Sequence, residues 1–111
     1  MLRIPNEPLY QMLRDGRVSE FNDAVKNGAV PDLTNCDFRN CDLKGLKAEG
    51  LDLSGCYFRN CDLRGIDFRK TNLEGASFHG AQISGCYFPT NLSPEEITMS
   101  VVHGTRVRLL S

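Results

Sequence analysis

The 111-residue chain lacks tryptophan, has only two histidines and carries almost no net charge. Its 13 Lys and Arg residues are balanced by 14 Asp and Glu residues, so the formal net charge is -1. This balance excludes a generally basic nucleic-acid binder and a strongly acidic solvating chain. No apolar run approaches the ~18 residues of a membrane span, and the first residues lack the apolar run of a secretory signal. We therefore expect no membrane association and a cytoplasmic protein.

What the sequence does contain is a repeat. The six residues Phe38–Leu43 recur letter for letter as Phe58–Leu63, twenty residues later. Within that interval lies a period of five, because every fifth residue from 33 to 88 is apolar. We call these the centre residues: Leu33, Phe38, Leu43, Ala48, Leu53, Phe58, Leu63, Phe68, Leu73, Phe78, Ile83 and Phe88.

The positions before and after each centre residue also favour particular residue types. Residues two positions before it are mostly small or apolar, and residues two positions after it are mostly Gly or Asn, which tolerate tight bends. A period of five fits neither a helix nor a simple alternation. It predicts short extended segments separated by corners. Four such segments per coil account for the exact sequence repeat after twenty residues.

Centre residues twenty positions apart are also alike, as expected when coils stack around a continuous interior. Phe38, Phe58 and Phe78 form one such column. We predict a structural core of these centres, other than Ala48, with the inward cysteines Cys36, Cys41, Cys56 and Cys61. Ala48 is small for a centre residue, so Lys47-Ala48-Glu49 predicts a local dent or bulge.

These units resemble the pentapeptide-repeat proteins, whose loose pattern is Ala-(Asp/Asn)-Leu-X-X. Asp42-Leu43-Lys44-Gly45 and Asp62-Leu63-Arg64-Gly65 match it well, although Cys stands where the family often has Ala. The resemblance covers residues 31–90, as 12 repeats. It implies an all-β solenoid, a right-handed quadrilateral parallel β-helix of about three coils, with short α-helical flanks at both ends.

The segments on either side of the repeats are predicted to be helical. Residues 1–30 predict an N-terminal helical cap with two short helices, one starting at Pro8 and one capped by Ser19. Residues 91–111 predict a helix and a tail. Ser93 caps that helix, and Glu96 completes a reciprocal capping box. A bare solenoid exposes apolar ends and unpaired edges, so we expect these flanks to be caps, with Ile97 and Val101 over Ile83 and Phe88. A homodimer contact through a terminal segment stays open.

Five cysteines, the four named above and Cys86, share one inward column. Their spacing gives no CxxC pair and no neighbouring His pair, so a zinc site is not predicted. Stacked in-register side chains do not offer a disulfide dihedral, and an odd count favours a reducing compartment. We interpret them as reduced, buried and slow to react.

No catalytic, metal or cofactor site is predicted. His79 and His103 lack carboxylate partners, no Ser occupies a nucleophile elbow, and the glycines are corners rather than a phosphate loop. We also expect the filled interior to leave no cleft.

The outward residues form the candidate surface. Arg39 and Arg59 stack in one column and Lys44 and Arg64 in the next, and this basic stripe can either pair with neighbouring Asp residues or bind a partner. Two tyrosines also point outward and can anchor a protein contact. The predicted partner-binding surface comprises Arg39, Lys44, Tyr57, Arg59, Arg64 and Tyr87.

Two functions follow as hypotheses. The first is a non-catalytic structural or adaptor protein that presents a rigid β-helix surface to an unidentified protein partner. The second comes from the resemblance, because some family members mimic duplex DNA and modulate type II topoisomerases such as gyrase. Three coils give a rod of roughly 14 Å, and basic residues interrupt its negative surface, which favours the first hypothesis. Direct nucleic-acid binding is not expected.

Overall fold

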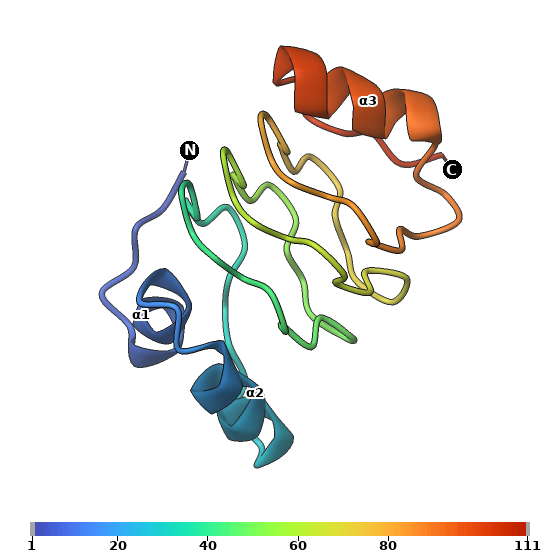
Figure 1. Ribbon diagram of the computed structural model, residues 1–111. Helices are drawn as coiled ribbons and strands as arrows, with labels where there is room; N and C mark the ends of the chain where they lie inside the picture. Colours follow the sequence, from blue (N-terminus) through green and yellow to red (C-terminus); the bar gives the residue numbers. More distant parts are fainter. Residues whose placement is uncertain (1, 111) are drawn as a thin grey trace.

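The computed structural model describes residues 2–110, with a coiled middle segment between helical ends (Figure 1). Helix α1 spans Pro8–Arg14, α2 spans Val18–Lys26, and α3 spans Pro94–His103. Met1 and Ser111, the outer ends of the two predicted flanks, lie outside the described residues.

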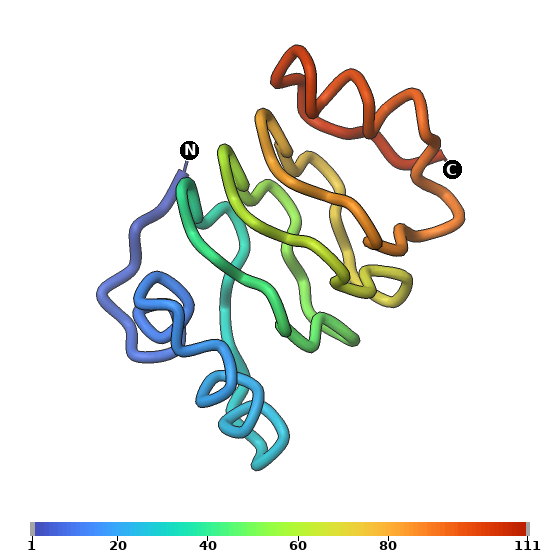
Figure 2. Tube along the Cα trace, in the orientation of Figure 1, coloured from blue at the N-terminus to red at the C-terminus, as the bar shows by residue number. Residues whose placement is uncertain are grey.

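The middle segment winds in stacked coils, as the tube in Figure 2 shows. Parallel β-bridges join residues twenty positions apart, so each coil has twenty residues. Asp37 forms a parallel β-bridge with Tyr57, and Tyr57 forms the next one with Ser77. The same interval joins Asp42 to Asp62 and Asp62 to Gln82. Each pairing is an isolated bridge, and residues 2–110 contain no longer strand, because a corner follows within every five residues. We name the coils by their residues: first (31–50), second (51–70) and third (71–90).

The corners follow the Gly and Asn column. Asn35, Asn40 and Asn60 have positive φ angles of 57°, 63° and 57°, in the left-handed region that Asn tolerates better than most residues. Gly55 has φ 69° and stands directly beside Asn35 in the next coil, where an added Cβ would collide with the Asn35 side chain. The corner therefore needs glycine for its backbone angle and for close stacking.

The interior is filled by the centre residues. The rings of Phe38, Phe58 and Phe78 stack with centroids 5.7 and 5.4 Å apart, and Tyr10 of α1 extends this column at 5.2 Å from Phe38. The predicted core residues of the first two coils are buried, as are Leu73 and Phe78 of the third. Ile83 and Phe88 are only partly buried, which corrects their assignment to the full core.

The N-terminal segment contacts the outer edge of the first coil. The Asp37 N–H donates to the Arg3 carbonyl at 2.9 Å, as it would to a preceding coil, and the Tyr10 hydroxyl donates to the Asp37 carbonyl. On α2, Asn22 donates to the Gly45 carbonyl at 2.9 Å and accepts from the Lys47 N–H at 3.0 Å. These groups satisfy backbone positions that a lone coil would leave unpaired.

The start of α2 differs from the prediction. Its N-cap is Arg17, no side chain caps it, and Ser19 lies inside the first turn. Arg17 instead pairs with Glu20 at 3.1 Å, which places a carboxylate in that turn, where the helix dipole favours it. The assignment of Ser19 as the cap was wrong.

The C-terminal segment lies along one edge of the third coil. The Ser100 hydroxyl of α3 accepts from the Phe78 N–H at 2.8 Å, and the Val101 carbonyl accepts from Gly80 N–H at 3.0 Å. The tail runs antiparallel to the coil: the Val107 N–H donates to the Ala76 carbonyl at 2.8 Å, and Val107 is fully buried.

One half of the predicted capping box is present. Ser93 accepts from the Glu96 N–H at 3.2 Å, but Glu96 does not return to Ser93. Its carboxylate accepts from the backbone N–H and the guanidinium of Arg108, both at 2.9 Å. The reciprocal box was wrong because the tail folds back and supplies a charged donor.

Candidate functional site

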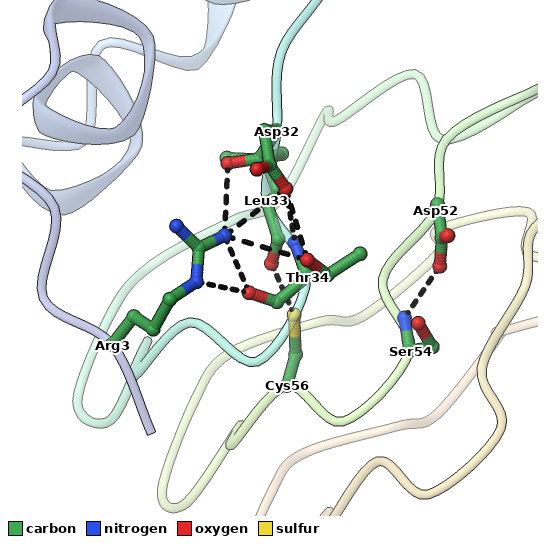
Figure 3. A network of polar contacts seen from close by, with 7 residues as sticks. All are labelled: Arg3, Asp32, Leu33, Thr34, Asp52, Ser54 and Cys56. Atoms are coloured by element: carbon green, nitrogen blue, oxygen red, sulfur yellow. Dashed lines mark hydrogen bonds and ion pairs between the residues drawn. The ribbon is translucent and has the colours of Figure 1, made fainter. Parts of the chain in front are cut away.

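The inward cysteines tie successive coils together. The Cys56 thiol donates to the Leu33 carbonyl oxygen at 2.9 Å, beside the Arg3–Asp32 ion pair (Figure 3). Three further residues make the same bond to the residue 23 positions earlier: Cys61 to Phe38, Cys86 to Leu63 and Thr71 to Ala48. A thiol or hydroxyl here adds a hydrogen bond that alanine cannot make.

Burial keeps most of these thiols protonated. It raises the pKa of Cys36 to about 11 and that of Cys56 to about 12, and it also raises the pKa of Cys86. Cys41 is the exception: its interaction with the Cys61 thiol and the nearby Arg14 guanidinium, 3.1 Å from Cys41 Sγ, lower its pKa. The same interaction with Cys41 raises the pKa of Cys61.

We expect all five thiols to be free, and Cys41 to react faster than the other three buried thiols. Because the thiolate is the nucleophile, Arg14→Ala should raise the pKa of Cys41 and slow its labelling by about tenfold per pKa unit. Timed iodoacetamide labelling at pH 7.5, followed by peptide mass spectrometry, measures this rate. The control is Lys26→Ala, which removes a cation of α2 and should leave the rate unchanged. Equal labelling rates at all five sites would contradict the expectation.

The basic stripe is largely neutralised by aspartates two residues earlier in the chain. Arg39 pairs with Asp37 at 2.7 Å, and Arg64 pairs with Asp62 at 2.7 Å. Lys44 reaches the same Asp62 carboxylate at 2.9 Å. Hydrogen bonds from Arg64 and Lys44 hold the pKa of Asp62 far below its usual range. The side chains of these outward cations are therefore held in place by the aspartates, which also compensate most of their positive charge.

Arg59 differs from the rest of the stripe. It has no carboxylate partner among the described residues, and its guanidinium donates to the Tyr57 hydroxyl at 3.3 Å. The guanidinium of Arg39 lies over the Tyr57 ring, 6.0 Å from its centroid. We call Arg39, Tyr57 and Arg59 the tyrosine cluster. On one column of the solenoid, it places one cation over the face of an aromatic ring and a second cation at the hydroxyl of that ring.

The second predicted tyrosine is not part of that cluster. Tyr87 belongs to the column of Asp67, two corners away from the column of Tyr57. Its ring is 59% exposed and lies 4.8 Å from the guanidinium of Arg69, which also pairs with Asp67 at 2.8 Å. The structure thus distributes the predicted partner-binding residues over three columns and brings only some of them together.

The first coil is open on one side, contrary to the expectation that no cleft exists. A hollow of about 780 Å³ lies between residues 45–49 of the first coil and 65–70 of the second. The predicted dent at Lys47-Ala48-Glu49 is confirmed at this place. The centre residues pack in the interior, but this packing does not prevent two coils from separating at the surface.

A family model for pentapeptide repeats matches eight copies, in residues 31–60 and 52–88. The two overlapping segments cover more than half of the 111-residue chain. The chain belongs to the pentapeptide-repeat family. Comparison with curated proteins and with solved structures gives no match.

In the described part of this pentapeptide-repeat protein, no group of three or more His, Cys, Asp or Glu residues could hold a metal ion. Over the same residues, no helix has the length and apolar character needed to cross a membrane. The surface features of this structure that could carry a function are the tyrosine cluster and the open side of the first coil.

Sequence reasoning missed the residues of the flanks that reach into the repeats. Tyr10, Arg14 and Asn22 each donate a hydrogen bond to a backbone carbonyl of the first coil. Arg106 similarly donates to the Gly75 carbonyl at 2.6 Å. No periodic signal marks these residues, because each contact occurs once and depends on how the flank docks.

Proposed function

We propose that this protein is a non-catalytic interaction module whose stacked coils present fixed side chains to a protein partner. Family membership supports a repeat protein with an interaction role. The twenty-residue spacing of the parallel bridges, with four corners per coil, supports the right-handed quadrilateral β-helix that the resemblance implies. A rigid scaffold lowers the entropy cost of binding, because its side chains are already held in place.

The observation that carries the proposal is the tyrosine cluster. Tyr and Arg are the residues most enriched among those that dominate binding energy at interfaces. Tyr57 is partly buried and contacts two cations, and the Arg59 charge is not compensated by a carboxylate of the described chain. We infer that Arg59 pairs with an acidic group of the partner while the Tyr57 ring packs against its surface.

Capture of partners from the native lysate on the purified protein tests this assignment. Arg59→Gln should retain the fold and reduce recovery of the partner by about tenfold or more, as expected for a dominant interface residue. Lys26→Gln, which removes another surface cation, is the matched control. If both variants capture the same proteins in the same amounts as the unmodified chain, the tyrosine cluster is not the partner-binding surface.

We place the DNA-mimic role second. The principal-axis extent of the described protein is 35 Å, including the helical flanks. Several of its carboxylates, such as Asp37, Asp62 and Asp67, are paired with arginines. A duplex presents one unpaired negative charge per about 1.7 Å, and this surface offers no comparable row.

A further inference from the structure

The ladder of hydrogen bonds between coils is interrupted at the open side. In most units the residue before the centre bonds to both neighbouring positions; for example, Tyr57 N–H donates to the Cys36 carbonyl at 3.0 Å, and Phe38 N–H donates to the Tyr57 carbonyl at 2.8 Å. The corresponding bonds from Asp67 N–H to Leu46 and from Ala48 N–H to Asp67 are absent. We call this gap, between residues 46–48 and 66–68, the seam.

The interruption is confined to the joint between the first two coils, where the bonds between residues 31–33 and Asp52 are also absent. One coil further on, Asp67 and Tyr87 form a regular bridge, and Phe68 N–H donates to the Tyr87 carbonyl at 2.7 Å. Next to the seam, Gly50 N–H donates to the Lys70 carbonyl at 2.8 Å, one residue beyond the position that other corners use. The register therefore slips by one residue, as in a β-bulge.

Two features of the sequence account for the seam. Leu46 and Ala48 reverse the usual order of a small inward residue followed by a large centre, whereas Cys86 and Phe88 keep that order in the third coil. Asn22 also holds the backbone on both sides of Leu46, at Gly45 and Lys47, toward the N-terminal helices. The first coil is thus drawn away from the second at this point.

The seam presents both donors and acceptors. Among the described residues, Ala48 N–H, Asp67 N–H and the carbonyls of Leu46 and Asp67 have no backbone hydrogen-bond partner. An inorganic anion could accept from the two N–H groups but would leave both carbonyls unpaired. A peptide backbone supplies an N–H and a C=O together, which is the chemistry of β-strand addition.

The charges around the seam add a preference for an acidic side chain. Arg69 is occupied by Asp67 at 2.8 Å, and Lys70 lies 3.4 Å from Glu49. Lys47 lines the same hollow and has no ion pair within residues 2–110. It is the cation of this site that remains available to a ligand carboxylate.

A second hollow extends the site. It has a volume of about 370 Å³, shares Glu49 with the first hollow, and is lined on its apolar side by Val25, Val30 and Leu51. The Val30 side chain is 90% exposed, although it is large and apolar. The two hollows together offer a polar seam followed by an apolar surface, which suits an extended peptide more than a compact ion.

We propose that the seam and the adjoining hollow bind a short extended peptide segment of a partner protein, by backbone pairing at Ala48 and Asp67, with an acidic residue of the peptide at Lys47. This site is separate from the tyrosine cluster and goes beyond the function proposed above. Nothing in it requires Arg59, so the two proposals can fail independently.

The binding test uses backbone amide shifts of the full-length protein in NMR titrations. The probes are acetyl-Asp-Val-Thr-Val-amide, the same peptide with Lys in place of Asp, and inorganic phosphate. We expect saturable shifts of the Ala48 and Asp67 amides with the acidic peptide. Weaker binding of the Lys peptide, by about fivefold or more, is the expected effect of one reversed charge. Shifts of these amides by phosphate but not by either peptide would overturn the proposal in favour of an anion site.

Two variants locate the acidic residue. Lys47→Gln should weaken binding of the acidic peptide to the level of the Lys peptide. Arg108→Gln, which removes an exposed cation from the C-terminal tail, should leave it unchanged. If Lys47→Gln binds as tightly as the parent, Lys47 does not contact the ligand and the assignment is wrong.

Amide hydrogen exchange tests the seam without any ligand. The Ala48 and Asp67 amides should exchange at least about a hundredfold faster than those of Tyr57 and Phe58, which are hydrogen-bonded in the ladder. The acidic peptide should slow exchange at Ala48 and Asp67. If these amides are as protected as those of Tyr57 and Phe58 in the free protein, the seam is closed in solution and the proposal fails.

Discussion

Replacing Phe58 by alanine is expected to reduce the free energy of unfolding by about 3–5 kcal/mol. Phe58 is the middle ring of its column, with Phe38 5.7 Å below and Phe78 5.4 Å above, and its side chain is 1% exposed. The coils are held apart by their backbone ladder, so the cavity cannot collapse around the smaller side chain. For a domain with a total stability of about 5–15 kcal/mol, such a loss is severe.

Equilibrium urea unfolding measures this loss. Arg59→Ala changes the adjacent outward residue, whose side chain is exposed and makes no ion pair in the described chain, and should stay within about 0.5 kcal/mol of the parent. A larger loss for Arg59→Ala than for Phe58→Ala would mean that the inward and outward columns are assigned the wrong way round.

Deleting residues 92–111 is expected to convert the protein into larger, polydisperse species. The deletion removes the partners of the Gly75, Phe78 and Gly80 N–H groups and uncovers the apolar face beneath Val107. Exposed backbone edges and apolar surface both promote association between copies. The prediction rests on the segment being a cap rather than a dimer contact.

Light scattering on the truncated chain separates these two roles. A stable, monodisperse monomer that is smaller than the parent assembly would mean that residues 92–111 are a dimer interface. Val107→Asp is a finer version of the same test, because it places a charge at a fully buried position and should also promote association. Leu110→Asp, at a side chain that is 63% exposed, is the matched control and should behave as the parent does.

The period of the sequence by itself determined the stacking of the coils. Contacts between coils join residues twenty apart, so the identity of Phe38, Phe58 and Phe78 predicts that they meet. The corner column follows for the same reason, since only a few residue types accept a left-handed backbone at every fifth position. The small centre at Ala48 also indicated where the ladder would open.

The tertiary structure alone decided what the flanks do. The Arg14 contact with Cys41, the Asn22 contacts with the first coil, and the antiparallel pairing of the tail each depend on how a non-repeating segment docks. The seam lies where Asn22 bonds to Gly45 and Lys47 and where the centre residue Ala48 is small, so the sequence could predict a dent but not the missing hydrogen bonds. In a repeat, residues that are a constant number of positions apart contact each other, so the sequence predicts these contacts. A single contact between unlike segments depends instead on how the whole chain packs.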